Sequence, residues 1–306
     1  MSAIYIDCTG PMLAHYDDEM QALWPELAVH RAEPAADALA GLIGENRGVL
    51  NGHTYLGAEV LGACPDLEVM VFLGIGATSY IDMDTAERRG VKVLNVTRYG
   101  DRTVAEHTLA LMLAGVRSIA AMDRLMRDGG WEPRQGGVEL RGKTLGILGL
   151  GGIGQEMARL GAALGMEVVA WSRSGLPDGV PARFAEIDAV VAGADVLSLH
   201  LAATPETEQI LDRRRLALLR PEAVLVNTAR GALIDEDALI EALEAGHIGH
   251  AALDVYAEEP LPADHPLRGI ENVTLTPHAA WISPEAARRL LIRGIETLRD
   301  ALVPKV

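Results

Sequence analysis

The fold of this chain is decided by the stretch Lys143-Thr144-Leu145-Gly146-Ile147-Leu148-Gly149-Leu150-Gly151-Gly152-Ile153-Gly154. Residues 144–148 are an apolar run of strand length, and a helical pattern follows over residues 155–164. Between them, Gly149, Gly151 and Gly154 spell G-x-G-x-x-G, with Gly152 and Ile153 inside the turn. A strand, a glycine turn and a helix N-terminus form the usual site for a dinucleotide pyrophosphate. The stretch predicts such a site; the alternative is a structural turn, because chance matches are expected among 32 glycines.

The next strand is expected over residues 166–171, and its end selects between NAD(H) and NADP(H). An NAD site usually has Asp or Glu there, which accepts hydrogen bonds from the ribose hydroxyls. This chain has Ser172, Arg173 and Ser174 instead. A guanidinium beside two hydroxyls can bind a 2′-phosphate, so the pattern favours NADP(H) and leaves NAD(H) possible. The alternative interpretation is a polar turn with a solvated Arg173.

Composition limits the class of protein. The chain has 306 residues, enough for two domains, and it is 49% hydrophobic without an apolar run long enough to span a bilayer. Residues 1–7 start a strand directly and lack the order of a signal peptide. The net charge is −16 with scattered basic residues, and Cys8 and Cys64 are too few for a disulfide framework or zinc site. We therefore expect a cytoplasmic protein without metal, nucleic-acid partner or membrane partner.

Short apolar strands alternate with helical segments along most of the chain. Strands are expected at 4–7, 28–30, 48–50, 67–72, 91–95, 144–148, 166–171, 189–190, 195–200, 223–227, 249–253 and 273–275. Helices are expected at 12–23, 35–43, 56–64, 83–89, 104–117, 155–164 and 284–302, and residues 118–142 read as an arm or linker. This rhythm predicts an α/β fold with two doubly wound parallel-sheet domains. A Rossmann cofactor domain (100–281) would be inserted into a flavodoxin-like substrate domain (1–99 plus 282–306).

Candidate catalytic groups follow three strands of the second series. They are Arg230 in Asn227-Thr228-Ala229-Arg230-Gly231, Glu259 after Leu253-Asp254-Val255-Tyr256, and His278 in Thr276-Pro277-His278. Taken singly, each has a bland alternative as a surface ion pair, a solvated carboxylate or a loop histidine. Together they form an acid–base set, because an imidazole can exchange a hydroxyl proton and a guanidinium can hold a carboxylate. Ligands in such sheets bind at the carboxyl ends of strands, which is where these residues lie.

These motifs, in this order and with the Gly149 turn before them, resemble the D-isomer-specific 2-hydroxyacid dehydrogenase family over residues 45–300. The resemblance implies that Arg230 binds the substrate carboxylate, that His278 is the general acid/base, and that Glu259 orients His278 and favours its protonated form. Asp254 matches a residue on the nicotinamide side of the cofactor, and His107 is expected to be structural. Further cofactor contacts are expected from Thr103, His200, Thr228, Ala229, His278 and Ala280. The arm at 118–142 looks like the family's dimerisation segment, so a homodimer is expected.

The loop at Gly76 and Ala77 looks like the family's substrate loop, whose backbone N–H groups bind the carboxylate beside Arg230 and His278. The chain departs from the family pattern here, with Ala77 and Ser79 where Gly and Asp are frequent. It departs again at Gly152, where Arg is frequent, and at 201–203, which lacks a common Pro. None of these changes removes a catalytic group.

The run Trp171-Ser172-Arg173-Ser174 and Trp281 look like the glyoxylate/hydroxypyruvate reductase branch of the family. The resemblance therefore implies an oxidoreductase that reduces a small 2-oxoacid with NADPH. The printed chain ends soon after its last helix, so no appended regulatory domain like that of long phosphoglycerate dehydrogenases is expected. The alternatives are an NAD-linked phosphoglycerate or D-lactate-type dehydrogenase and a non-catalytic, cofactor-sensing binding protein.

Overall fold

The computed structural model describes residues 2–132 and 137–302. The chain divides into two compact units, Met1–Gly100 with Ile282–Val306 and Asp101–Trp281. The boundaries expected from sequence lie at 99/100 and 281/282. Within the described ranges, no helix combines the length and the apolar character that crossing a bilayer requires.

Unit 1 is built on a parallel sheet in the order β2-β1-β3-β4-β5. This is the strand order of flavodoxin-like folds. The strands are β1 (Ala3–Tyr5), β2 (Ala28–Val29), β3 (Gly48–Asn51), β4 (Val69–Phe72) and β5 (Lys92–Asn95). The helices are α1 (Gly10–His15), α2 (Asp18–Leu23), η1 (Ala36–Ala38), α3 (Leu39–Ile43), α4 (Ala58–Ala63), η2 (Ala77–Ser79), α5 (Met83–Arg88) and α12 (Pro284–Leu302).

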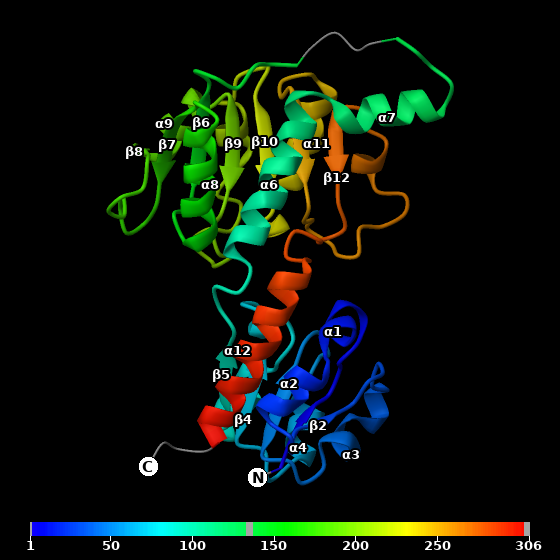
Figure 1. The fold of residues 1–306 in the computed structure, drawn as a ribbon. Helices are drawn as coiled ribbons and strands as arrows, with labels where there is room; N and C mark the ends of the chain where they lie inside the picture. The colour runs from blue at the N-terminus through cyan, green and yellow to red at the C-terminus, as the bar shows by residue number, and fades with distance from the viewer. Residues whose placement is uncertain (1, 133–136, 303–306) are drawn as a thin grey trace. The chain divides into compact units, whose positions relative to one another are not determined.

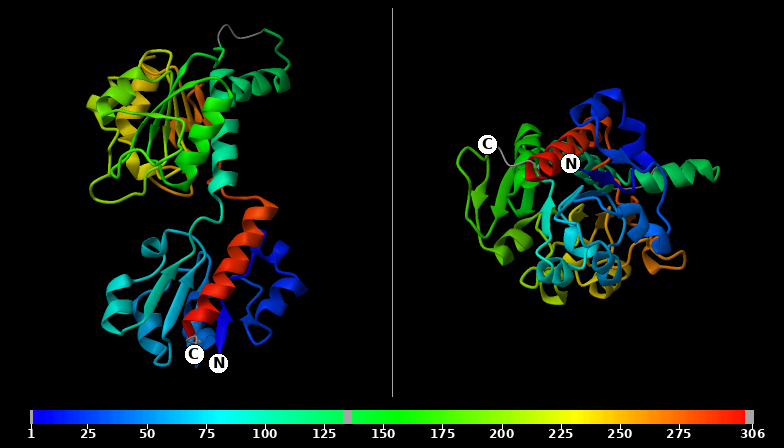
Figure 2. Two further views of the ribbon diagram at one scale, coloured as in Figure 1. Left: turned by 60° about the vertical axis from the view of Figure 1, so that its left-hand side comes forward. Right: turned by 90° about the horizontal axis from the view of Figure 1, so that it is seen from below.

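Helix α12 belongs to unit 1 although it closes the sequence, and Figure 2 shows it lying along the sheet of that unit. Two glycines permit its close approach. A side chain on Gly48 of β3 would meet Leu298 and Leu302, and one on Gly294 of α12 would meet Leu73. Burial of an apolar stripe of α12 on β3 and β4 therefore joins the two ends of the chain.

Unit 2 is built on a parallel sheet in the order β12-β11-β10-β9-β6-β7-β8. The strands are β6 (Thr144–Leu148), β7 (Glu167–Trp171), β8 (Arg183–Phe184), β9 (Val196–Leu199), β10 (Val224–Asn227), β11 (His250–Leu253) and β12 (Val273–Leu275). The helices are α6 (Asp101–Val116), α7 (Ile119–Arg127), α8 (Gly152–Ala163), α9 (Ile187–Gly193), α10 (Arg213–Leu216), η3 (Gly231–Leu233), α11 (Glu236–Glu244) and η4 (Pro266–Arg268). Strand order reverses between β6 and β9, which is the switch point where doubly wound sheets bind ligands.

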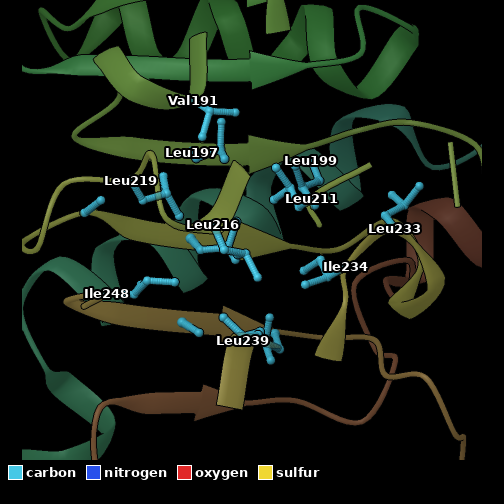
Figure 3. Close-up of a cluster of buried hydrophobic side chains, with 14 of the residues drawn as sticks. Val191, Leu197, Leu199, Leu211, Leu216, Leu219, Leu233, Ile234, Leu239 and Ile248 are labelled. Atoms are coloured by element: carbon cyan, nitrogen blue, oxygen red, sulfur yellow. The ribbon is translucent and has the colours of Figure 1, made fainter. Parts of the chain in front are cut away.

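Alternate residues of the central strands in unit 2 face two separate cores. On one face, α6 and α8 pack against residues such as Val196 and Val226, and Figure 1 shows these two helices side by side. On the other face, α9, α10 and α11 cover a leucine-rich cluster that includes Leu197 and Leu239 (Figure 3). Burial on both faces explains why these strands read as continuous apolar runs.

Several local predictions differ from the structure, including the following four. The helix expected at 12–23 is broken, because the Asp17 side chain accepts from the Met20 N–H and starts a new helix. Residues 189–190, expected as a strand, lie inside α9, since a short apolar run does not distinguish the two states. Strand β8 was not predicted. The expected arm contains α7, and its residues 133–136 lie outside the described ranges.

Candidate active site

The glycine turn after β6 has the geometry that the fingerprint demands. Gly149 has φ +101°, and a side chain there would collide with the carbonyl of His200 after β9. A side chain on Gly154 would collide with the carbonyl of Gly149, so the third glycine lets α8 pack against the turn. Gly151, by contrast, faces open space. Two of the glycines are therefore needed by the fold, and the middle one leaves backbone accessible.

This turn fits a dinucleotide on the evidence of its own backbone. Gly151 caps α8 without a side-chain hydrogen bond. The N–H groups of Gly152, Ile153 and Gly154 donate to no acceptor within the described residues. Unpaired N–H groups and the positive end of the helix dipole favour a pyrophosphate. One feature opposes it: the carboxylate of Asp101 occupies the space that a side chain at Gly152 would fill.

The polar run after β7 presents one exposed cation. Ser172 is buried and its hydroxyl donates to the carbonyl of Gly175, whereas Arg173 and Ser174 are exposed. The pKa of Glu206 is lowered chiefly by a hydrogen bond from Thr204 and, to a smaller extent, by the charge of Arg173. A phosphate bound by Arg173 would thus compete with the nearby carboxylate of Glu206.

Arg230 is held in a tight loop after β10. The Asn227 side chain donates to the carbonyl of Arg230 (2.8 Å) and accepts from the N–H of Ala229 (3.0 Å). The Arg230 guanidinium donates to the carbonyl of Ala229 (2.6 Å), and its other N–H groups have no acceptor in the described part of the chain. A side chain on Gly231 would overlap the backbone of Tyr256 and Ala257, so this glycine brings the Arg230 loop against the loop that follows β11.

Glu259 and His278 form a hydrogen-bonded pair. Glu259 Oε2 lies 2.6 Å from His278 Nδ1, and Glu259 Oε1 accepts from the N–H of Tyr256 (3.0 Å). Burial alone would raise the pKa of Glu259, but the hydrogen bonds from His278 and Tyr256, with the charges of His278 and Arg230, lower it. The carboxylate is therefore ionised at neutral pH and accepts a hydrogen bond from Nδ1–H. His278 Nε2 is left for another partner, on a side chain that is 41% exposed. The structure thus brings Arg230, Glu259 and His278 into one cluster.

The loop that carries His278 is organised by Asp254. His278 has φ +52°, a left-handed conformation that is unusual for a residue with a side chain. The fully buried Asp254 carboxylate accepts from the N–H groups of Ala279 and Ala280 (2.9 Å each) and from the Thr276 hydroxyl (2.5 Å). Burial would raise the pKa of Asp254, and hydrogen bonds from His107, Thr276 and these amides outweigh it and lower that pKa. Asp254, expected to face the cofactor, here supports the loop of His278.

The other expected cofactor residues lie around the same strand ends. His200 Nε2 pairs with Ser198 (2.9 Å), and burial lowers the pKa of His200 to about 4, so the ring is neutral. The Thr228 hydroxyl donates to Thr108 on α6 (2.7 Å), because Thr108 gives its own proton to Val104. Thr103 lies in the first turn of α6. Cofactor contacts by these residues stay predictions. No group of three metal-ligating side chains gathers within residues 2–132 and 137–302.

In unit 1, the expected substrate loop folds as the turn η2 after β4. Ala77 is 1% exposed, and its N–H donates to Asn95 Oδ1 (3.2 Å). The N–H groups of Ile75 and Gly76 have no acceptor among the described residues. If the loop binds a carboxylate, the N–H groups of Ile75 and Gly76 are therefore available as donors, whereas that of Ala77 is engaged by Asn95.

Comparison with known proteins decides the family. Residues 109–280 match the model of the D-isomer specific 2-hydroxyacid dehydrogenase, NAD binding domain. The chain belongs to the D-isomer specific 2-hydroxyacid dehydrogenase family. Its relatives include a D-3-phosphoglycerate dehydrogenase of Mycobacterium bovis, 40% identical over 89% of this chain. The chain spans only 50% of that relative's length.

Relatives of similar length carry other names. A glyoxylate reductase of Aeropyrum pernix is 39% identical over 78% of this chain and 75% of its own. A hydroxypyruvate reductase of Thermotoga maritima is 36% identical over 82% of each. Among solved structures, an acyclic imino acid reductase in complex with NADPH and D-Arg is 29% identical, with a TM-score of 0.86 over 99% of this chain and 97% of its own. The two-domain Rossmann architecture of this family is confirmed.

Sequence reasoning missed the residues that hold the loops of Arg230, Glu259 and His278 in place. Asn227, Gly231 and Tyr256 lie in the motifs that pointed to the site but received no role. The buried Tyr256 hydroxyl is directed at the carbonyls of Thr276 (2.8 Å) and Leu253 (3.2 Å), which ties the β11 and β12 ends together. The signal that could have found them is their place beside a catalytic residue within the same short motif.

Proposed function

We propose that this protein reduces a small, unphosphorylated 2-oxoacid, glyoxylate or hydroxypyruvate, with NADPH as its preferred cofactor. The observation that carries the proposal is the hydrogen bond between His278 Nδ1 and the ionised Glu259, with Arg230 close enough to lower the pKa of Glu259. An imidazole with one nitrogen fixed by a carboxylate can give and take a proton at the other.

The chain's own groups have separate roles in this proposal. Arg230 holds the substrate carboxylate with the N–H groups that Ala229 does not use. His278 Nε2 holds the proton that goes to the carbonyl oxygen of the substrate, while Glu259 keeps Nδ1 protonated. A bound nicotinamide supplies the hydride that reduces the carbonyl carbon. The N–H of Gly76 is a further proposed donor to a carboxylate.

The preference for NADPH rests on the absence of a carboxylate at 172–174 and on the exposure of Arg173. The imino acid reductase structure, which contains NADPH, supports this choice. The matching domain model is named for NAD, so both cofactors belong in any assay.

The test is a panel of 2-oxoacids, with glyoxylate, hydroxypyruvate, pyruvate and 3-phosphohydroxypyruvate, each assayed with NADPH and NADH. We expect the highest kcat/KM for glyoxylate or hydroxypyruvate with NADPH. The 40% identity to a phosphoglycerate dehydrogenase favours the phosphorylated substrate as the second candidate. A preference for 3-phosphohydroxypyruvate with NADH would establish that candidate, and no turnover with any pair would favour a cofactor-sensing protein.

We also propose that the protein is a homodimer formed through the arm. Helix α7 extends away from the sheet of unit 2 in both Figure 1 and Figure 2. Its Ile119 and Met126 are 52% and 51% exposed, and Trp131 beyond it is 81% exposed. Burial of such apolar side chains against a second copy would remove them from water.

A further inference from the structure

We propose that His107 is a positioning residue, which fixes the loop of His278 through Thr276 and Asp254. The proposal deepens the proposed function, because it concerns the catalytic histidine of that same site. His107 lies on α6, far from the loop in sequence, and does not contact His278 itself in any hydrogen bond of the described chain.

The direction of the hydrogen bonds links His107 to the loop. His107 Nε2 lies 3.3 Å from Thr276 Oγ1 and 3.6 Å from Asp254 Oδ1. Thr276 has one hydroxyl proton, and it goes to Asp254 Oδ1 (2.5 Å). The oxygen of Thr276 must therefore accept from His107, which makes Nε2 the protonated nitrogen of that ring. Among the described side chains, His107 brings the only basic nitrogen within 4 Å of the Asp254 carboxylate.

The same carboxylate holds the catalytic loop in its unusual conformation. Besides Thr276, Asp254 accepts from the N–H groups of Ala279 and Ala280, the two residues that follow His278. The N–H of His278 donates to the carbonyl of Asp254 (2.8 Å). These bonds surround the left-handed His278, whose conformation persists only if its neighbours hold it. Loss of the His107 donor would free Thr276 to turn and would weaken the hold of Asp254 on the loop.

A purely structural histidine is the competing explanation, and the chain supplies a matched control for it. His250 on β11 is buried, whereas the His107 side chain is 26% exposed, and His250 Nε2 pairs with Thr274 of β12 (2.9 Å), two residues before Thr276. Within the described part of the chain, the side chains of that pair make no hydrogen bond to Asp254 or to the loop. Substitution of His250 should lower stability without a selective effect on the loop.

The experiment compares His107→Leu, His107→Gln, Thr276→Val and His250→Leu in the full chain. Hydrogen–deuterium exchange over residues 276–281 is measured first, because it needs no substrate. We expect faster exchange there for His107→Leu and Thr276→Val but not for His250→Leu, with wild-type exchange restored by Gln, whose amide keeps a donor at the Nε2 position. Unchanged exchange in His107→Leu, or an equal rise over the whole of unit 2, would overturn the proposal.

Kinetics with glyoxylate and NADPH give the second readout. We expect kcat to fall about tenfold in His107→Leu while KM and the Kd of NADPH stay nearly constant, because the loop geometry rather than binding is changed. The double variant His107→Leu/Thr276→Val should be no slower than the slower single variant, and additive losses would refute action through Thr276. If wild type turns over no 2-oxoacid, the proposed function fails, and the exchange result alone decides the role of His107.

Discussion

At the scale of single residues, His278 and Arg230 have distinct proposed roles that kinetics can separate. We propose that His278 transfers a proton through Nε2, whereas Arg230 binds a carboxylate with guanidinium N–H groups that have no acceptor among the described residues. We expect His278→Ala to lower kcat by about 10²–10⁴-fold, the usual worth of a general acid. Arg230→Ala should mainly raise KM. Steady-state rates with glyoxylate measure both, and an unchanged kcat in His278→Ala would end the catalytic assignment.

Glu259 acts on His278 through charge as well as through a hydrogen bond. Its lowered pKa keeps the carboxylate ionised at neutral pH, so its charge and its hydrogen bond act together at His278 Nδ1. We expect Glu259→Gln to lower kcat, since the amide keeps a hydrogen-bond partner for Nδ1 without the charge. Steady-state rates measure the loss, and an unchanged kcat in Glu259→Gln would contradict this role.

Arg173 is the residue on which the proposed preference for NADPH rests. The 2′-phosphate of NADPH would pair with the exposed guanidinium of Arg173. NADH lacks that phosphate, so its binding would not depend on this pair. We expect Arg173→Ala to weaken NADPH binding by about tenfold and to leave the Kd of NADH unchanged. Fluorescence titration of both cofactors gives the result, and Ser172→Asp should shift the preference toward NADH. Equal losses for the two cofactors would show that Arg173 does not read the phosphate.

At the scale of elements, we expect two histidines of unit 2, His200 directly after β9 and His250 within β11, to make stability depend on pH. Burial lowers the pKa of His200 and, with help from Arg124, that of His250, each to about 4. In the unfolded chain, these histidines bind their protons near the ordinary pKa of about 6.5, so the neutral histidines make their full contribution to the free energy of unfolding above that pH. This contribution is lost as the pH falls toward 4.

We therefore expect the free energy of unfolding to drop between pH 6.5 and 4.5, by up to about 3 kcal/mol for each histidine once the pH has fallen past its folded pKa. Urea titrations of wild type and His250→Gln at several pH values measure the slope. The variant should show a shallower decline, because it removes one of the two protons. Parallel slopes would mean that His250 is not the group that titrates.

Elements also differ in how far their sequence predicts them. Residues 144–148, 273–275 and 284–302 have the predicted bounds, because a strand between glycines and a long amphipathic helix carry strong local signals. Residues 189–190 carry a run too short to decide between helix and strand, and their packing against β6 and β7 in α9 decides it. The two-residue strand β8, which was not predicted, pairs with the edge of β7.

At the scale of the whole molecule, the exposed apolar arm predicts the oligomeric state. We expect a dimer by light scattering at micromolar concentration. Met126→Asp on α7 should dissociate it, because a carboxylate cannot be buried without a partner. Leu176→Asp, an equally apolar exposed site elsewhere on unit 2, serves as the control and should stay dimeric. A wild-type monomer would contradict the proposed homodimer.

The amino-acid sequence alone predicted the two parallel-sheet domains and the glycine turn. It also singled out Arg230, Glu259 and His278 as the candidate catalytic residues. The spacing of apolar residues, the spacing of glycines and the position of polar residues after strands are local properties, so one sequence is enough to recognise them. The tertiary structure decided what those residues touch. The Asp254 carboxylate accepts from the loop of His278, the N–H of Ala77 donates to Asn95, and His107 contacts Thr276. All three contacts join residues that are distant in the sequence. Each is a hydrogen bond between groups that only packing can align, and no pattern within either segment encodes it.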